Sequence, residues 1–395
     1  MSTPQAPSAP DPLAGGPPRP DGPSRPGGDP RRPPSRLARR LPLLALALVA
    51  LLTGLWAGLL RLGFDIPELR PALASLHGPL LVLGFLGTQI GLERAVALRR
   101  RWPYLVPAAA AAGALWLVVG LPADVGKALL AVGGLGLVAV FVVVHRIQAS
   151  WHNVVMGLGA LAWLVGSVAW LAGAALADVV PWLAAFLVLT IVGERLELSR
   201  MRRPPASALR LLLAAVAIFL AGVVLTGAWP GFGVRLAGAG LIAQSAWLWR
   251  YDIARLTIRT AGAARYMAAA LISGYAWLGV AGVVWLVDGK LVGYGFGYDA
   301  MLHAIFVGFV FSMIFAHAPV IVPAVLSVAL PYRPAFYAPL ALLHAGLVIR
   351  LLGGAFESSG TWRLGGALNE LAIVGYLALA AATAVRARRR PAPAG

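Results

Sequence analysis

The chain has 395 residues, of which 59% are hydrophobic and 12% are charged, with a formal net charge of +18 and no cysteine. Soluble domains carry about 25% charged residues, so a soluble fold of this size could not bury so much apolar surface. The absence of cysteine excludes disulfides, thiolate-held iron–sulfur clusters, c-type haem and thiol catalysis. The basic residues lie in short patches between apolar runs, which indicates a lipid bilayer as the partner and no nucleic acid.

Residues 1–40 differ from the rest of the chain. They are rich in Pro, Gly, Ser and Arg and have no apolar periodicity, which predicts a disordered, cytoplasmic tail. This segment is too long and too proline-rich for the charged start of a signal peptide. The first apolar run, Leu41 to Leu62, is therefore expected to be a retained membrane span.

Apolar runs continue along residues 41–386, each close to the roughly 20 residues that cross a bilayer as a helix. They predict an all-α integral membrane protein with about twelve transmembrane helices, followed by a basic cytoplasmic tail at 387–395. The runs are 41–62, 75–98, 103–121, 127–147, 154–176, 179–199, 208–228, 232–250, 264–287, 299–328, 335–353 and 366–386.

The basic residues also predict the orientation of these spans. If the N-terminal tail is cytoplasmic and the runs alternate, the inner segments hold 26 of the 33 Lys and Arg residues and the outer segments hold 7. An excess of Lys and Arg in inner loops is the usual bias of membrane proteins. We therefore expect a multi-pass protein of the bacterial inner membrane, with both termini in the cytoplasm.

A short motif recurs in the second, sixth and tenth runs. Glu93-Arg94 ends the second run and Glu194-Arg195 ends the sixth, 101 residues later. Gly308-Phe309 of the tenth run matches Gly84-Phe85 of the second, and this alignment puts His317 opposite Glu93. The pattern predicts three repeats of four helices. The alternative is a chance match, since charges are common at the cytoplasmic ends of helices.

Two of the six histidines are expected at matching depth. His77 lies at the outer end of the second run and His303 at the outer end of the tenth. Ionisable residues inside spans are costly and are candidates for function. Two imidazoles from facing helices can hold one haem iron. The alternative is a pair of interfacial histidines hydrogen-bonded to water or to the backbone.

A second polar group is expected near the cytoplasmic ends of the same helices. His317 follows His303 by 14 residues, which returns it to nearly the same helical face roughly 21 Å deeper. It would then be level with Glu93 and Glu194, and the three side chains could form a metal site or a proton relay. The simpler alternative, which we favour, is a set of Glu–Arg and His contacts that satisfy the helix ends.

A haem would also need partners for its propionates, and arginine binds carboxylates in a bidentate fork. The expected outer segments offer Arg235, Arg350 and Arg363. Arg363 is the preferred candidate, because the loop between the last two runs can fold over a site beside the tenth. The alternative role of Trp362-Arg363 is an ordinary interfacial anchor.

The residues that follow the two histidines resemble a known family. Two segments are similar to the NnrS family of haem- and copper-containing membrane proteins. The closer match is His303-Ala-Ile-Phe-Val-Gly-Phe-Val-Phe-Ser-Met-Ile, and the looser one is His77-Gly-Pro-Leu-Leu-Val-Leu-Gly-Phe. That family usually has His-x-His-Glu in the second helix, whereas Pro79 and Leu80 stand at the later two positions here. The resemblance implies a b-type haem between His77 and His303 and a link to nitric oxide stress, and leaves copper open as a second metal.

The span plan also resembles subunit I of haem–copper oxidases, which has twelve helices in three sets of four. Its low-spin haem is held by histidines near the outer ends of helices two and ten, corresponding to His77 and His303. Here the sixth and seventh runs contain no histidine, so the oxidase copper site has no counterpart. The tenth run also lacks the pair of histidines that would hold a second haem. Reduction of oxygen or nitric oxide at a binuclear centre is therefore not expected.

The leading hypothesis is a membrane protein with one b-type haem, linked to the nitric oxide response or to electron transfer in the membrane, with redox or nitric oxide metabolism partners. Whether it is an enzyme is left open. One rival is a cofactor-free twelve-helix transporter of a small solute, with helices broken at Pro319 and Pro323 along its path. Another is a haem-free scaffold or sensor subunit.

Overall fold

The computed structural model describes residues 36–326 and 328–389, and these are almost entirely helical, with no strand among them. The first 35 residues of the expected N-terminal tail and residues 390–395 of the expected C-terminal tail lie outside the described residues. The first span begins earlier than expected, since α1 already starts at Arg36. The last helix extends to Arg389, further than expected.

The helices follow the apolar runs in chain order. The first half of the chain contains α1 Arg36–Arg61, η1 Leu73–Leu76, α2 His77–Pro79, η2 Leu80–Leu86, α3 Gly87–Leu98, η3 Trp102–Tyr104, α4 Leu105–Val119, α5 Ala123–Ile147, α6 Trp151–Leu171, α7 Leu176–Ser199 and η4 Arg200–Arg202. The second half contains α8 Ala206–Leu225, α9 Pro230–Tyr251, α10 Ala254–Thr257, α11 Gly262–Asp288, α12 Gly295–His303, η5 Ala304–Phe311, α13 Ser312–Leu326, η6 Pro334–Phe336, α14 Tyr337–Ala355 and α15 Ser359–Arg389.

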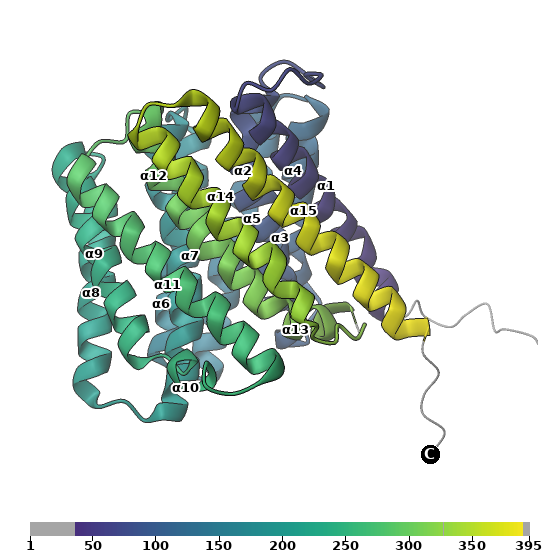
Figure 1. The fold of residues 1–395 in the computed structure, drawn as a ribbon. Coiled ribbons are helices and arrows are strands. Elements are labelled where there is room, and N and C mark those ends of the chain that lie inside the picture. The colour runs from purple at the N-terminus through teal and green to yellow at the C-terminus, as the bar shows by residue number, and fades with distance from the viewer. Residues whose placement is uncertain (1–35, 327, 390–395) are drawn as a thin grey trace, which may run out of the picture. The chain divides into compact units, whose positions relative to one another are not determined.

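Eleven helical stretches in the described residues are long and apolar enough to cross a membrane. The expected run at 232–250 forms a further long helix, α9, whose hydropathy is reduced by Arg235, Gln244 and Arg250. Every expected run is therefore helical. Helices that are neighbours in sequence pack against each other, such as α8 with α9 and α14 with α15 (Figure 1). This is the make-up of a multi-pass helical membrane protein.

Three of these stretches are more buried than the others. The hydrophobic windows of Leu73–Leu98, Leu176–Arg202 and Gly295–Val325 are 61%, 72% and 56% buried, whereas no other window exceeds 50%. A helix that is apolar all round has to be covered by other helices or by lipid, and these three are covered mostly by protein. They are the second, sixth and tenth runs, which carry the recurring Glu-Arg and Gly-Phe motifs.

The second and tenth runs share an unusual backbone. In each, a π-helical segment follows the histidine: η2 begins three residues after His77, and η5 begins directly after His303. In each, a hydroxyl donates to the carbonyl of the aligned glycine, Thr88 to Gly84 and Ser312 to Gly308, both at 2.6 Å. Because π-helical turns are rare and occur often at functional sites, their presence here marks these segments as candidates.

The tenth run is continuous through its two prolines. Pro319 and Pro323 lie inside α13, which continues to Leu326. The helix break proposed for a transporter path was therefore wrong. Neighbouring helices and local adjustments can satisfy the carbonyls that a proline leaves without a donor, which makes proline tolerable in membrane helices.

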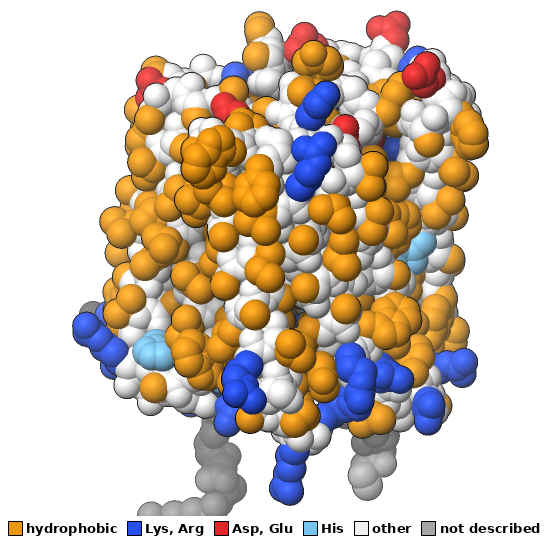
Figure 2. Space-filling view, turned by 90° about the vertical axis from the view of Figure 1, so that its left-hand side faces the viewer, with side chains coloured by type: hydrophobic (Ala, Val, Ile, Leu, Met, Phe, Trp, Pro, Cys, Tyr) orange, Lys and Arg blue, Asp and Glu red, His pale blue; other side chains and the backbone are white. Residues whose placement is uncertain are grey.

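Charge is distributed unevenly along the helices. Figure 2 shows one face on which hydrophobic side chains cover the middle and Lys and Arg gather at the lower end, whereas acidic side chains lie only at the upper end, together with further Lys and Arg. The lower end is the one at which Figure 1 shows α10. This asymmetry agrees with the Lys and Arg bias that the sequence predicted, and it sets a basic end apart from an acidic end.

Candidate functional site

A cavity of about 530 Å³ lies at the end of the helices opposite to α10. Its walls come from α1, from the second run, from the start of α7, from α12 with η5, and from α14 and α15. Most of its lining is apolar, including Leu55, Val82, Phe306 and Ile373. The volume is in the range of about 300–1,000 Å³ that is typical of small-molecule and cofactor sites.

His77 and His303 both line this cavity. Their ring centroids are 6.3 Å apart and the ring planes differ by 26°. The tertiary structure thus brings together two side chains that are 226 residues apart in the sequence.

The Nδ1 atoms of both rings are already engaged. His77 Nδ1 lies 2.8 Å from the carbonyl oxygen of Gly54, and His303 Nδ1 lies 2.8 Å from that of Asp299. A carbonyl can only accept, so each ring carries its proton on Nδ1 and leaves Nε2 as the lone-pair nitrogen. A hydrogen bond at one imidazole nitrogen is the usual device that fixes the other for a metal.

Asp299 supports His303 from within a buried ion pair. Its carboxylate accepts two hydrogen bonds from Arg350, of 2.8 and 2.6 Å, and one of 2.9 Å from Trp362 Nε1. The same carboxylate lies 3.2 Å from His303 Nδ1. The Arg350 guanidinium also stacks over the Trp362 ring at 5.3 Å. A carboxylate behind a histidine fixes its orientation and raises its basicity as a ligand.

The pair of histidines fits a metal held between two imidazoles. The ring centroids are 6.3 Å apart, a separation that leaves room for a metal with metal–nitrogen bonds of about 2 Å on each side. The described residues contain no group of three or more His, Cys, Asp or Glu side chains that could hold a metal ion. A metal held by these two imidazoles would take its remaining ligands from outside the protein side chains, as a porphyrin with its four nitrogens would provide.

Other polar residues of the cavity were not found from the sequence. Arg61, Asp299, Asn369 and Glu370 all line it. An ionisable residue one turn before a candidate ligand, as Asp299 is to His303, is a signal that the sequence did contain. Glu370 gave a weaker signal, a single carboxylate within the last apolar run.

Arg363, the preferred propionate partner, lies outside the set of residues that line the cavity. Its guanidinium donates to the carbonyl of Gly63 at 2.6 Å and stacks over Phe64 at 4.9 Å. Arg350 lines the cavity but is engaged with Asp299. Arg61 is therefore the arginine of the cavity that is better placed to meet an anionic group, since the described residues give its side chain no hydrogen-bond or ion-pair partner.

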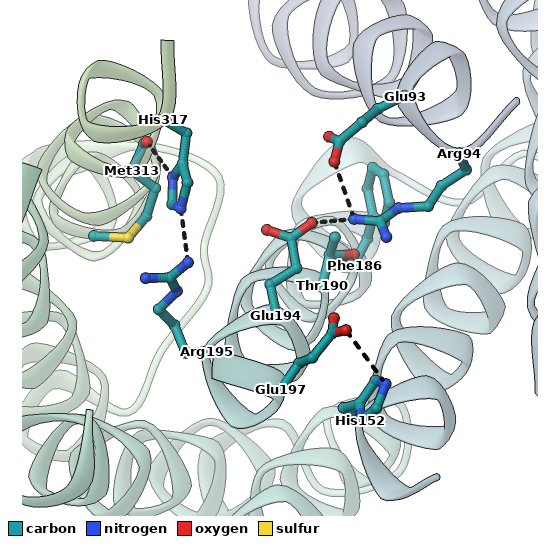
Figure 3. A network of polar contacts seen from close by, with 10 residues as sticks. All are labelled: Glu93, Arg94, His152, Phe186, Thr190, Glu194, Arg195, Glu197, Met313 and His317. Carbon is teal, nitrogen blue, oxygen red and sulfur yellow. Dashed lines mark hydrogen bonds and ion pairs between the residues drawn. The ribbon is translucent and has the colours of Figure 1, made fainter. Parts of the chain in front are cut away.

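The second polar group, at the basic end of the helices, is an ion-pair network (Figure 3). Arg94 lies between Glu93, at 3.4 Å, and Glu194, with which it forms a close ion pair. Arg195 donates to His317 Nε2 at 2.8 Å, and His317 Nδ1 lies 2.7 Å from the carbonyl of Met313. Glu93, Glu194 and His317 each have an arginine partner, whereas the buried Nε atoms of Arg94 and Arg195 have no partner among the described residues. This is the arrangement expected of contacts that satisfy helix ends, and the metal or relay role of His317, Glu93 and Glu194 stays a prediction.

Two further histidines have local partners. His344 accepts a hydrogen bond of 3.0 Å from Trp277 Nε1, which joins two helices. His152 is buried, with its Nε2 3.1 Å from the hydroxyl of Ser150. Neither residue lines the large cavity.

A glycine of α1 makes room for His77 and provides a test of the ring position. A Cβ at Gly58 would contact Glu370 Oε1 and would lie 2.8 Å from His77 Cε1. We expect Gly58→Ala to displace the His77 ring. If His77 holds the haem implied by the sequence resemblance, this variant should contain about ten-fold less haem, because ligand orientation controls affinity. Haem content is measured by the pyridine haemochrome assay. Gly375→Ala on α15, where a Cβ would meet nothing within 4 Å, is the matched control, and equal haem contents for the two variants would contradict the expectation.

Long apolar helices and a cavity lined by two histidines define a multi-pass helical membrane protein with a candidate ligand site. The chain belongs to the family described as Domain of unknown function (DUF8744), whose model matches residues 40–385. No curated protein and no solved structure matches the chain. The matched range includes every residue that lines the cavity.

Proposed function

We propose that the protein binds one b-type haem in the cavity, with His77 and His303 as axial ligands. The observation that carries this proposal is the pair of imidazoles 6.3 Å apart, each with Nδ1 on a backbone carbonyl and Nε2 left as the available nitrogen. The residues named by the resemblance to the NnrS family are the same two. Haem, when bound, would supply a one-electron iron couple whose potential depends on its axial ligands and surroundings.

The residues of the chain would hold, orient and shield the group. Gly54 and Asp299 would fix the two rings through their carbonyls, and the Asp299 carboxylate would orient His303 further. The apolar walls exclude water. Arg61 is available for a propionate, since Arg350 is committed to Asp299.

The expected role is electron transfer in the membrane or a haem-linked part of the nitric oxide response. Because His77 and His303 would fill both axial positions, electron transfer is favoured over the binding of a gas at the iron. The proposal includes an inner-membrane location with the basic end in the cytoplasm, which the distribution of Lys and Arg supports. The high burial of the second, sixth and tenth runs supports a plan of three sets of four helices, as in subunit I of haem–copper oxidases.

An optical spectrum tests this function directly. Protein purified in detergent from cells supplied with a haem precursor should show a Soret band, and its reduced-minus-oxidised spectrum should show the sharp bands of a low-spin b-type haem. Metal analysis of the same sample distinguishes iron in haem from a bare copper ion. Folded, monodisperse protein without Soret absorbance would overturn the proposal.

A further inference from the structure

A separate pocket of about 440 Å³ lies at the basic end of the helices, between the start of α6, the end of α7 with η4, and the start of α8. Its lining combines polar and apolar side chains, including Ser150, Trp151, Arg200, Arg203 and Leu209. No aspartate or glutamate lines it. The pocket has no part in the haem proposal, because the histidine cavity is at the opposite end.

The two arginines of this pocket are not used elsewhere. Within residues 36–326 and 328–389, neither the Arg200 nor the Arg203 guanidinium has an ion-pair or hydrogen-bond partner. Arg202, between them, behaves differently: it donates to the carbonyls of Arg250 and Asp252, both at 3.1 Å, and thereby ties η4 to the end of α9. One arginine therefore holds the segment in place, while the two on either side leave their charges available at the pocket.

The backbone that carries Arg203 is held in an uncommon conformation. Arg203 has φ +46°, in the left-handed region, and its N–H donates to the carbonyl of Arg200 at 3.0 Å. Pro204 and Pro205 follow, and their rings restrict the backbone angle φ up to the start of α8. A non-glycine residue in this region is costly and is often associated with a functional site. The turn sets Arg200 and Arg203 on one pocket.

Backbone donors add to the positive charge. The pocket includes the first residues of α6 and α8, Trp151 and Ala206, and neither helix has a side-chain cap at its N-terminus. The first N–H groups of a helix have no partner within the helix, and together with the helix dipole they favour an anion. Two uncapped helix starts and two unpaired guanidiniums thus converge on one cavity.

We propose that this pocket binds a phosphate group, with the headgroup of an anionic phospholipid as its source. Arginine and helix N-termini both suit phosphate oxygens. Trp151 is 54% exposed and Met201 is 72% exposed beside the arginines, as expected where a helix end meets the membrane interface. Basic pockets between helices at this side of a membrane suit anionic lipid headgroups.

The test uses full-length, delipidated protein in detergent and two probes, phosphatidylglycerol and inorganic phosphate. Lipid binding is measured by native mass spectrometry, with phosphatidylcholine as the comparison lipid, and phosphate binding by calorimetry. The variant Arg200→Gln/Arg203→Gln should bind phosphatidylglycerol about ten-fold more weakly. The control Arg255→Gln/Arg259→Gln removes the same charge from exposed residues at the same end and should bind as the native protein does.

The possible results distinguish whether the pocket binds a phosphate group at all and whether that group belongs to a lipid. Weaker phosphatidylglycerol binding in the first variant alone supports a lipid headgroup. The same dependence for inorganic phosphate, with no preference for phosphatidylglycerol, supports the phosphate site but assigns it a soluble ligand. Equal weakening in both double variants, or no binding of either probe, overturns the proposal. Arg200→Lys/Arg203→Lys, which keeps the charge, should retain most binding and shows whether loss in the glutamine variant reflects misfolding.

Discussion

Replacement of either His77 or His303 by alanine is expected to remove most of the bound haem, lowering the Soret absorbance per protein by at least about ten-fold. Each ring would provide one ligand to the proposed haem, and each is oriented by a hydrogen bond from Nδ1 to a backbone carbonyl. The absorbance ratio of the Soret band to the protein band, measured on the purified variants, gives the result.

His344→Ala is the matched control for these variants. His344 is also a partly buried histidine of a membrane helix, but it contacts Trp277 and does not line the cavity. Its replacement should leave the Soret band in place. Added imidazole should restore part of the absorbance in His303→Ala, because the small ring can occupy the vacated ligand position. If both single alanine variants keep the native absorbance, the haem is not held by this pair.

Removal of the Asp299 carboxylate is expected to have the second large effect. The Arg350 and Asp299 side chains are only 9% and 15% exposed, so Asp299→Ala would leave a guanidinium with little access to solvent and no carboxylate. Loss of one partner of a buried ion pair costs about 3–5 kcal/mol. We expect a clear fall in the midpoint of thermal unfolding in detergent, followed by the fluorescence of the tryptophans.

A double replacement separates the ion pair from its role at His303. Asp299→Leu with Arg350→Met removes both charges and should destabilise the protein less than the sum of the single replacements, because neither charge is left buried alone. Asp299→Asn, which keeps the shape but loses the charge, should shift the reduction potential of bound haem through His303. If the loss of stability in the double variant equals the sum of the losses in the two single variants, the two residues stabilise the protein independently. An unchanged potential in Asp299→Asn would rule out the positioning role.

The histidine pair shows how much of the candidate site the sequence could predict. Run lengths and charge bias placed His77 and His303 at one depth on one side, because helical rise per residue and the hydrocarbon thickness are fixed quantities. The partners of the two rings were not predictable in the same way. Gly54 reaches His77 from another helix, and Arg350 reaches Asp299 from a helix 51 residues later.

Arg363 is a candidate site residue whose contacts the sequence did not predict. The sequence placed it in the loop before the last helix, but it lies within α15, which already begins at Ser359. Its guanidinium contacts the segment after α1, where it donates to the carbonyl of Gly63 and stacks over the Phe64 ring. Arg350 was counted as an outer-loop residue in the sequence, yet it lies within α14 and is nearly buried. Long side chains near helix ends can reach several ångströms in either direction, so sequence position alone does not fix their contacts.

The sequence by itself determined that this is a helical membrane protein with spans close to the expected runs, because apolar length and Lys and Arg bias act locally on each segment. Only the tertiary structure decided that the second, sixth and tenth runs are the most buried, that His77 and His303 lie 6.3 Å apart over a cavity, and that Asp299 links one of them to Arg350. Those properties depend on which helix faces lie against one another. In a membrane that choice rests on close packing and interhelical hydrogen bonds between distant segments, which leave little trace in a single apolar run.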